Sequence, residues 1–132
     1  MKFLLDTHVL LWTLFEPEKL STKARQQLLN QKNTIYVSSI SFWEISIKYG
    51  LGKIEFNGID PSTFPDYAKK MGFELLLLNP DDAATVHKLK GTWHRDPFDR
   101  LLIWQALQQS LTMITKDEKI AQYHEEGLKL IW

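Results

Sequence analysis

The chain alternates between short apolar runs and longer segments of helical character, and this alternation constrains the fold more than any other feature of the sequence. Strands separated by helices predict βαβ units, because parallel strands need a long crossover connection between them. We therefore expect an α/β protein, a three-layer α/β/α sandwich whose central sheet is mainly parallel and covered by helices on both faces. The predicted strands are Lys2–Leu5, Ile35–Val37, Glu74–Leu78, Leu111–Thr115 and Leu128–Ile131.

Capping residues mark the ends of several predicted helices. Ser21 can cap one helix and Ser38 or Ser39 another, because a side-chain hydroxyl satisfies the free amides of the first turn. Gly50 and Gly52 end the second of these helices. The predicted helices are Thr7–Phe15, Thr22–Asn30, Ser39 to about Tyr49, Asp60 to about Gly72, Pro80–Lys90, Phe98 to about Gln109, and Asp117–Tyr123.

The length of 132 residues favours one domain over residues 1–132, and the 44% of hydrophobic residues argue against disorder. Cysteine is absent, which excludes disulfides, thiolate zinc sites, iron–sulfur clusters and thiol nucleophiles. The 16 basic and 16 acidic side chains balance, so a strongly basic arm is excluded but a local basic patch is not.

The first residues imitate a signal peptide, since Lys2 precedes an apolar stretch. Asp6 and His8 interrupt that stretch, however, and no small-residue cleavage site follows. No apolar run reaches the roughly 18 residues that a membrane-spanning helix needs. We therefore expect a cytoplasmic protein that does not enter a membrane.

Four acidic residues stand in unusual places. Asp6 directly follows the first predicted strand, and Asp117 lies two residues after the strand Leu111–Thr115. Both fall on the carboxyl edge of a parallel sheet, where functional groups gather. Glu44 lies in an apolar helical segment, where an unpaired carboxylate is costly to bury, and Asp99 lies in the first turn of a long apolar helix. We expect the four carboxylates to converge.

Each of these acids also has a purely structural explanation. Asp6 and Asp117 can be helix caps. Asp96, followed by Pro97 and then by Asp99 three residues later, fits a helix start of the capping-box type. Glu44 has Lys48 four residues later as a partner for an ion pair.

Converging carboxylates would repel one another, and a divalent cation removes that conflict. Oxygen ligands without cysteine or clustered histidine favour Mg²⁺ or Mn²⁺ over Zn²⁺. Such a cation favours phosphate-bearing substrates, and the implied chemistry is hydrolysis of a phosphodiester by a metal-activated water or a two-metal clamp.

Several neighbours of the acids can support such a site. Arg100 adjoins Asp99 and can hold an acid, meet a scissile phosphate or form a surface salt bridge. His8 and His94 are weaker candidates for general acids, because metal-assisted hydrolysis needs no histidine. Three hydroxyl residues can orient metal ligands or simply cap helices: Thr7, Ser38 and Thr115.

The segment His87–Arg100 is locally basic and is our predicted path for an RNA backbone, with a solvated surface loop as the alternative. Trp93 can stack on a base there, whereas Trp12, Trp43 and Trp104 lie in apolar helices and are expected in the core or at a dimer contact. The helices Thr7–Phe15 and Phe98–Gln109 are apolar over much of their surface, so we expect a homodimer. The basic side chains of the predicted RNA path are Lys88, Lys90 and Arg95.

Four stretches of the sequence resemble the PIN-domain ribonucleases of the VapC type, the toxins of bacterial type II toxin–antitoxin pairs. They occur in the order and spacing of that family, and together they cover essentially the whole chain. The matching stretches are Leu4–His8, Ser38–Lys48, His94–Leu102 and Ile114–Asp117.

The resemblance implies that Asp6, Glu44, Asp99 and Asp117 bind the metal, with Asp96 as an uncertain fifth acid. It implies a small α/β/α sandwich that dimerises and cleaves structured RNA, often tRNA or ribosomal RNA. It also implies a cognate antitoxin that blocks the site, in some cases by placing a basic side chain against the acids.

Three other functions remain open at this point. A phosphotransfer domain of the haloacid-dehalogenase type would need a second aspartate two residues after Asp6, where the chain has His8. A non-catalytic domain that binds RNA or a protein partner would use the acids only as caps. A DNA-directed metal nuclease would use the same carboxylates, because metal-assisted hydrolysis does not itself select the sugar.

Overall fold

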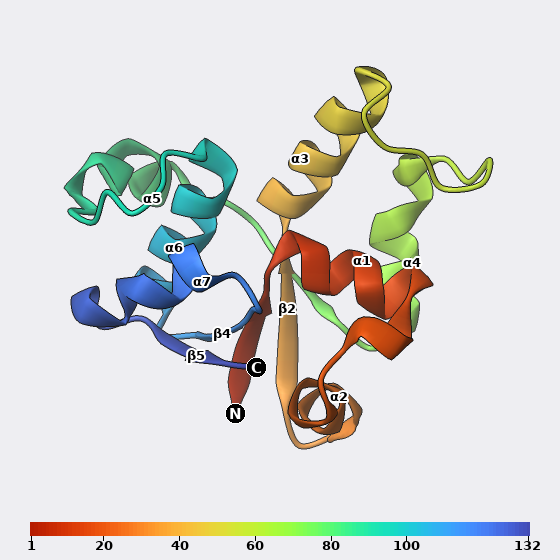
Figure 1. Ribbon diagram of the computed structural model, residues 1–132, viewed down its shortest axis with the longest axis horizontal. Coiled ribbons are helices and arrows are strands. Elements are labelled where there is room, and N and C mark those ends of the chain that lie inside the picture. The colour runs from red at the N-terminus through yellow and green to blue at the C-terminus, as the bar shows by residue number, and fades with distance from the viewer.

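The computed structural model describes residues 1–132 and contains one sheet of five parallel strands in the order β3-β2-β1-β4-β5 (Figure 1). Every strand is short and rich in aliphatic residues, as expected where both faces of a parallel sheet are covered. The strands are β1 (Lys2–Leu5), β2 (Thr34–Ser38), β3 (Glu74–Leu76), β4 (Thr112–Ile114) and β5 (Lys129–Ile131).

Helices fill the connections between the strands. None of them is long and apolar enough to cross a membrane. The α-helices are α1 (Thr7–Phe15), α2 (Thr22–Leu29), α3 (Ser39–Gly50), α4 (Phe64–Lys70), α5 (Pro80–Thr85), α6 (Pro97–Gln109) and α7 (Glu118–Ala121). Four 3₁₀ turns accompany them, namely η1 (Pro17–Lys19), η2 (Pro61–Thr63), η3 (Val86–Lys88) and η4 (Gln122–Glu126).

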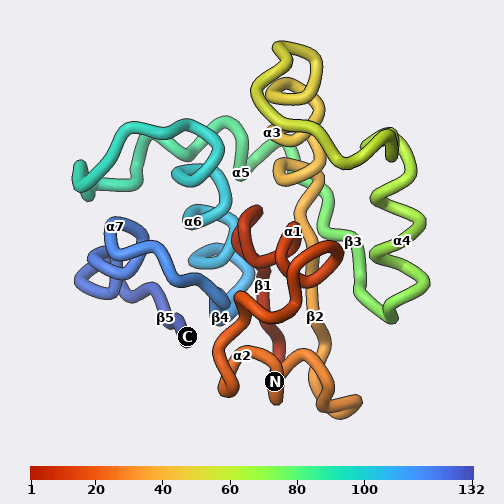
Figure 2. The backbone as a smooth tube through the Cα atoms, turned by 45° about the vertical axis from the view of Figure 1, so that its right-hand side comes forward, coloured from red at the N-terminus to blue at the C-terminus, as the bar shows by residue number.

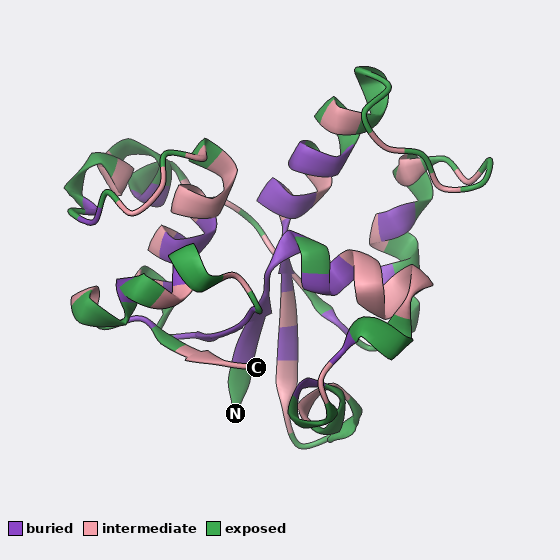
Figure 3. Ribbon diagram, viewed as in Figure 1, coloured by how far each residue is buried: buried purple, intermediate pink, exposed green.

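Alternate residues of each strand pack into two separate cores, one on each face of the sheet. Phe3 and Leu5 of β1 pack with α1, α2 and α4, whereas Leu4 packs with α6 and α7. Figures 1 and 2 show these two groups of helices on opposite sides of the strands, and Figure 3 shows the buried residues concentrated between them. The expected three-layer α/β/α sandwich is therefore confirmed.

The strand order places a topological switch beside β1. The chain leaves β1 toward β2 on one side, and β4 enters later on the other side, with Leu5 opposite Ile114. Helices that follow neighbouring strands on opposite sides leave a crevice at the carboxyl ends of those strands, where α/β proteins commonly bind ligands. Asp6 and Thr115 follow β1 and β4 directly at this crevice.

One predicted helix is wrong in its second half. The segment Pro80–Lys90 forms α5 only as far as Thr85 and then tightens into η3. Thr85 and Val86 are adjacent β-branched residues, whose side chains crowd a helix interior. The Thr85 hydroxyl also donates to the backbone oxygen of Asp81 at 2.7 Å. The other predicted elements are present, with ends that differ by a few residues.

Candidate metal centre

Asp6 is buried at the carboxyl end of β1, with only 3% of its surface exposed. It caps α1, since one carboxylate oxygen accepts a weak hydrogen bond from the His8 amide at 3.4 Å. Its other oxygen accepts from the Thr115 hydroxyl at 2.8 Å. The capping interpretation of Asp6 is thus confirmed, but the cap leaves the carboxylate facing β4.

Thr115 connects Asp6 to a second acid. Its hydroxyl donates to Asp6 and accepts from the backbone amide of Asp117 at 3.0 Å. Asp117 caps α7 with one oxygen, Oδ1, which accepts from the amides of Lys119 and Ile120. Asp117 is therefore both a helix cap, as the sequence indicated, and a neighbour of Asp6, with its Oδ2 not engaged by the cap.

Asp96 and Asp99 stand at the start of α6. Asp96 caps the helix through Oδ1, which accepts from the amides of Phe98 at 2.9 Å and Asp99 at 3.2 Å. Asp99 turns into the molecule, and its Oδ2 lies 3.5 Å from Nε2 of His94. The two aspartates of this motif thus differ, since Asp96 serves the helix and Asp99 faces the site.

Glu44 is buried on α3 with 3% of its surface exposed. Its Oε2 lies 2.5 Å from the ammonium nitrogen of Lys48, so the ion pair considered from the sequence is present. Its Oε1 is buried and has no hydrogen-bond partner. A buried carboxylate oxygen without a partner is costly and calls for an explanation.

The carboxylates influence one another strongly. The pKa of Asp99 is raised from its ordinary value of 3.8 to about 8, first by burial and then by four neighbouring negative charges. Burial also raises the pKa of Asp6, despite its hydrogen bond from Thr115. The four charges that act on Asp99 are those of Asp6, Asp96, Glu44 and Asp117.

The other four acids of the sequence prediction therefore lie within electrostatic reach of Asp99; they come from the end of β1, from α3, from the start of α6 and from the β4–α7 connection. No three histidine, aspartate or glutamate side chains, however, come close enough together to form a coordination sphere as they stand. Only two buried side-chain nitrogen or oxygen atoms lack a hydrogen-bond partner, Oε1 of Glu44 and Nε2 of His94, and both lie at this site.

The donor set fits a hard divalent cation. It contains carboxylate and hydroxyl oxygens and no sulfur, which are the ligands of Mg²⁺ and Mn²⁺. The oxygens left for such an ion are the unpartnered Oε1 of Glu44, Oδ2 of Asp96 and Asp117, and the carboxylate of Asp99, which accepts no hydrogen bond. A divalent charge would also offset the repulsion that raises the pKa of Asp99.

The hydroxyls of Thr7 and Ser38 bond to other polar groups and not to the acids. The Thr7 hydroxyl donates to that of Ser41 at 2.9 Å. The Ser38 hydroxyl caps α3 and donates to the side-chain oxygen of Gln105 at 2.6 Å, which ties α3 to α6. Sequence reasoning missed Ser41 and Gln105, although Gln105 is a lone polar residue in the apolar run Leu101–Leu107.

Arg100 neither holds an acid nor forms a surface salt bridge, the two ion-pair roles expected of it. Its guanidinium turns away from Asp99 and donates to the carbonyls of Leu89 and Gly91 and to the hydroxyl of Tyr123. Three backbone and hydroxyl acceptors satisfy the planar donor fork better than the single carboxylate of Asp99 would. Arg100 therefore fixes the segment before α6.

Glu126 and Tyr123 complete this clamp, and neither was identified from the sequence. The Glu126 carboxylate accepts from the amides of Lys90 at 2.8 Å and Gly91 at 2.6 Å. Trp93 is half-buried and packs edge-on against Tyr123 at 4.7 Å. Its stacking on a base stays a prediction. The three basic side chains of the segment remain exposed, namely Lys88, Lys90 and Arg95.

The other tryptophans are divided between the fold and the surface. Trp12 packs against Trp132, and Nε1 of Trp104 donates to the Thr85 hydroxyl at 3.0 Å. Trp43 is 52% exposed and therefore does not belong to the core.

A family model described as the PIN domain matches residues 3–126 of the chain. The chain is 26% identical over 129 residues to Ribonuclease VapC22 of Mycobacterium tuberculosis, covering 98% of this chain and 97% of that protein. A similar solved structure is VapBC2 from Rickettsia felis bound to a DNA fragment from their promoter (19% identity, TM-score 0.70, 99% and 98% covered). Another is FitAcB from Neisseria gonorrhoeae (18% identity, TM-score 0.66, 98% and 96% covered).

The raised pKa of Asp99 predicts that the stability of the metal-free protein depends on pH. Between its unfolded value of 3.8 and its folded value of about 8, the folded state binds the proton more tightly. The contribution of Asp99 to the free energy of unfolding should therefore be fully present below pH 4 and be lost as the pH rises to about 8. Asp99→Asn should remove this loss and raise Tm at pH 8 by at least about 3 °C, but much less at pH 4.

Scanning calorimetry in the presence of a chelator measures this effect. Asp81→Asn is the matched control, because Asp81 is exposed on α5 and outside the acid cluster. An equal change in Tm at both pH values for Asp99→Asn would contradict the electrostatic origin of the effect.

Proposed function

The chain belongs to the PIN domain family, and from this premise we propose that it is a metal-dependent endoribonuclease that acts as the toxin of a toxin–antitoxin pair. The observation that carries the proposal is the gathering of four acids around the carboxylate of Asp99, whose pKa is raised to about 8; the four are Asp6, Glu44, Asp96 and Asp117. Caps alone would not require Glu44, which caps no helix, to be buried with an unpartnered oxygen.

Asp6, Glu44, Asp99 and Asp117 would hold Mg²⁺ or Mn²⁺, with Asp96 available through its second oxygen. When bound, such an ion supplies an activated water and neutralises charge on the phosphate that is attacked. Thr115 keeps the Asp6 carboxylate oriented toward β4 through its 2.8 Å hydrogen bond. Asp99 would lose its proton from the carboxyl group as the ion binds, because metal ligands must be deprotonated.

We propose that the RNA backbone lies along the clamped segment before α6. Arg100 and Glu126 both hold the backbone of this segment. Arg100 donates to its carbonyl oxygens, and Glu126 accepts from its amides. Lys88, Lys90 and Arg95 are exposed on it and can pair with phosphates. Structured RNA such as tRNA or ribosomal RNA is the proposed substrate, which implies the cytoplasm as its place of action.

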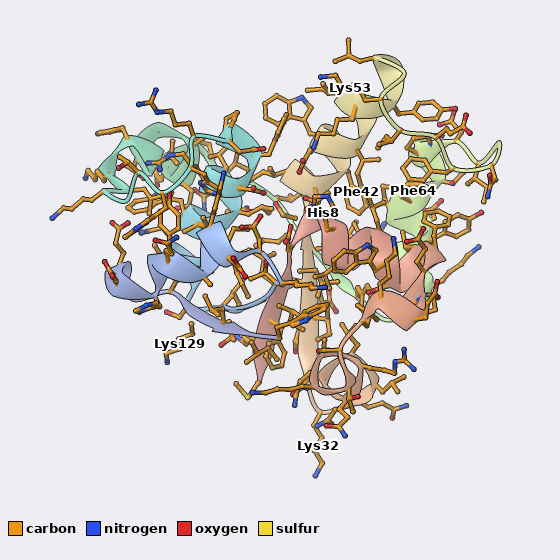
Figure 4. The ribbon with its side chains drawn as sticks, in the orientation of Figure 1. His8, Lys32, Phe42, Lys53, Phe64 and Lys129 are labelled. Atoms are coloured by element: carbon orange, nitrogen blue, oxygen red, sulfur yellow. The ribbon has the colours of Figure 1, made fainter.

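An apolar track leads away from the acids and is our proposed docking surface for an antitoxin. The track consists of three adjoining hollows on the surface. Phe15 and Ile59 line both the hollow next to His8 and the middle hollow, and Met71 lines both the middle hollow and the one next to Leu29. The track begins at His8, two residues after Asp6, and ends at Leu29. Figure 4 shows His8 at the start of α1 and close to the base of α3.

An extended partner segment suits this track better than a globular one, because the three hollows follow one another past α1, α2 and α4. Met71 is 47% exposed and Leu29 is 74% exposed, so large apolar side chains line it without cover. The similar solved structures are named as pairs, VapBC and FitAcB, which supports a partner for this chain as well.

We further propose that two copies of the chain pair through α3. Trp43, Ile47 and Leu51 occupy successive positions four residues apart and are 52%, 37% and 66% exposed. Residues at this spacing form one stripe on a helix. Trp43 also packs edge-on against Phe98 of α6 at 5.0 Å, so the stripe continues onto the helix that carries Asp99.

The nuclease proposal predicts metal-dependent cleavage that the carboxylates control. Chelator-stripped protein should cut a mixture of tRNA and ribosomal RNA only after addition of Mn²⁺ or Mg²⁺. Asp6→Asn and Asp99→Asn should each lower the cleavage rate by at least about 100-fold, because each removes a ligand. Both variants should keep or raise Tm, since each relieves repulsion between carboxylates.

Asp81→Asn is again the control and should cleave at the wild-type rate. A duplex and a single-stranded DNA tested in parallel distinguish an RNA from a DNA nuclease. Cleavage that persists in chelator, or wild-type rates in both site variants, would contradict the proposal.

The partner proposal predicts that Met71→Glu abolishes complex formation with the product of the adjacent gene. A charge in the apolar track would be buried without a partner when the complex forms. Co-expression followed by size-exclusion chromatography measures the complex, and RNA cleavage by the free variant should stay at the wild-type rate. Leu77→Glu is the matched control, because Leu77 is 76% exposed and lies outside the track. A complex that survives Met71→Glu but not Leu77→Glu would contradict the track.

The dimer proposal predicts a change of mass in solution. Light scattering at micromolar concentration should give a dimer for the wild type and a monomer for Ile47→Glu, which places a charge in the centre of the α3 stripe. Leu77→Glu should remain dimeric. A monomeric wild type would show that the stripe serves another purpose.

A further inference from the structure

Lys48 is the lysine that enters the acid cluster. It follows Glu44 by one turn of α3, and its ammonium nitrogen lies 2.5 Å from Oε2 of that carboxylate. The two partners differ in exposure, since the side chain of Glu44 is 4% exposed and that of Lys48 is 35% exposed. The ammonium therefore reaches inward from the surface to a carboxylate that is almost entirely buried.

This ion pair differs from an ordinary surface pair of the same length. Lys19 and Glu16 also approach to 2.5 Å, but their side chains are 53% and 45% exposed. Exposed pairs of that kind contribute little, because water screens both charges. Glu44 has no such screening, and loss of its partner would leave a buried charge.

Lys48 also responds to acids other than its direct partner. Burial alone would lower its pKa, but the hydrogen bond and charge of Glu44 raise it, and the charges of Asp96 and Asp99 raise it further. The ammonium thus lies in the field of the same carboxylates that would hold a divalent cation. No other lysine or arginine forms an ion pair with these acids, since Arg100 turns to the backbone before α6.

We propose that Lys48 is a resident counter-cation, which neutralises Glu44 in the metal-free protein and competes with the divalent cation for the acid cluster. The inference rests on the proposed metal-dependent function. Two cations cannot approach the same carboxylate without repelling each other, so occupation of the site must weaken the contact between Lys48 and Oε2. The protein gains a folded metal-free state in return for a weaker affinity for the metal.

This competition has a signature that a merely structural ion pair lacks. If Lys48 only oriented Glu44, its loss would misplace a ligand and weaken metal binding. If it competes, its loss removes a positive charge from the site and strengthens metal binding. In both cases the metal-free protein loses stability, because Glu44 is left buried and unpaired.

Calorimetric titration of Mn²⁺ into chelator-stripped protein separates the two possibilities. Lys48→Met should bind Mn²⁺ about tenfold more tightly than the wild type, since removal of one charge a few ångströms away lowers the repulsion substantially. The metal-free Tm of the same variant should fall, and saturating Mn²⁺ should restore more of its stability than it adds to the wild type.

Three further variants make the result specific. Lys48→Arg keeps the charge and should bind Mn²⁺ within about twofold of the wild type. Lys19→Met removes the exposed pair of equal length and should change neither affinity nor Tm. Lys48→Gln, which is neutral but can still donate a hydrogen bond to Glu44, should bind more tightly in the same way and replaces Lys48→Met if that variant does not fold.

The outcomes distinguish this inference from the function on which it rests. Weaker or unchanged Mn²⁺ binding by the neutral variants, beside a wild type that binds, overturns the competition and leaves the metal site intact. A folded wild type that binds no Mn²⁺ overturns both.

Discussion

The rest of this structure depends on the cost of gathering like charges in a poorly solvated place. Four carboxylates act electrostatically on a fifth, Asp99, near the carboxyl edge of the sheet, and two of them, Asp6 and Glu44, are almost fully buried. Such an arrangement opposes folding unless something compensates each negative charge. The neighbouring helices, hydroxyls and lysine can all be understood as parts of that compensation.

Helix N-termini supply one part of it. Asp6, Asp96 and Asp117 each cap a helix, so the amino ends of α1, α6 and α7 all point into the site. The free amides and the helix dipole favour negative charge at these ends. A cap and a metal ligand are therefore compatible roles, because Asp96 and Asp117 use only Oδ1 for the cap. The helix-cap role that the sequence offered as an alternative therefore does not compete with the metal-ligand role.

The sequence predicted the parts of the fold that local pattern determines. Short aliphatic runs and helix caps were sufficient for the five parallel strands, and the strand ends placed Asp6 and Asp117 together. The burial of Glu44 was predicted from its apolar surroundings. The break of the segment Pro80–Lys90 depends on one β-branched pair, a weaker signal than the apolar periodicity around it.

The residues that sequence reasoning missed act through tertiary contacts. Arg100 lies beside Asp99 in sequence, yet its fork is used by the carbonyls of Leu89 and Gly91, which only the folded loop presents. Glu126 is 35 residues from Gly91 and accepts from its amide. No local pattern reveals such partners, because each of these side chains bonds to backbone groups of a segment that is remote in sequence.

Two different positive charges reduce the repulsion at the site in the absence of a metal ion. A proton on Asp99 is retained up to a pH of about 8, and the ammonium of Lys48 stays on Glu44. At the proposed metal site a divalent cation would replace both, and its binding would release a proton from Asp99 and weaken the contact between Lys48 and Glu44. The proposed metal affinity would then be linked to pH through Asp99 and to the α3 surface through Lys48. The same helix carries both the Glu44–Lys48 pair and the exposed stripe that begins at Trp43.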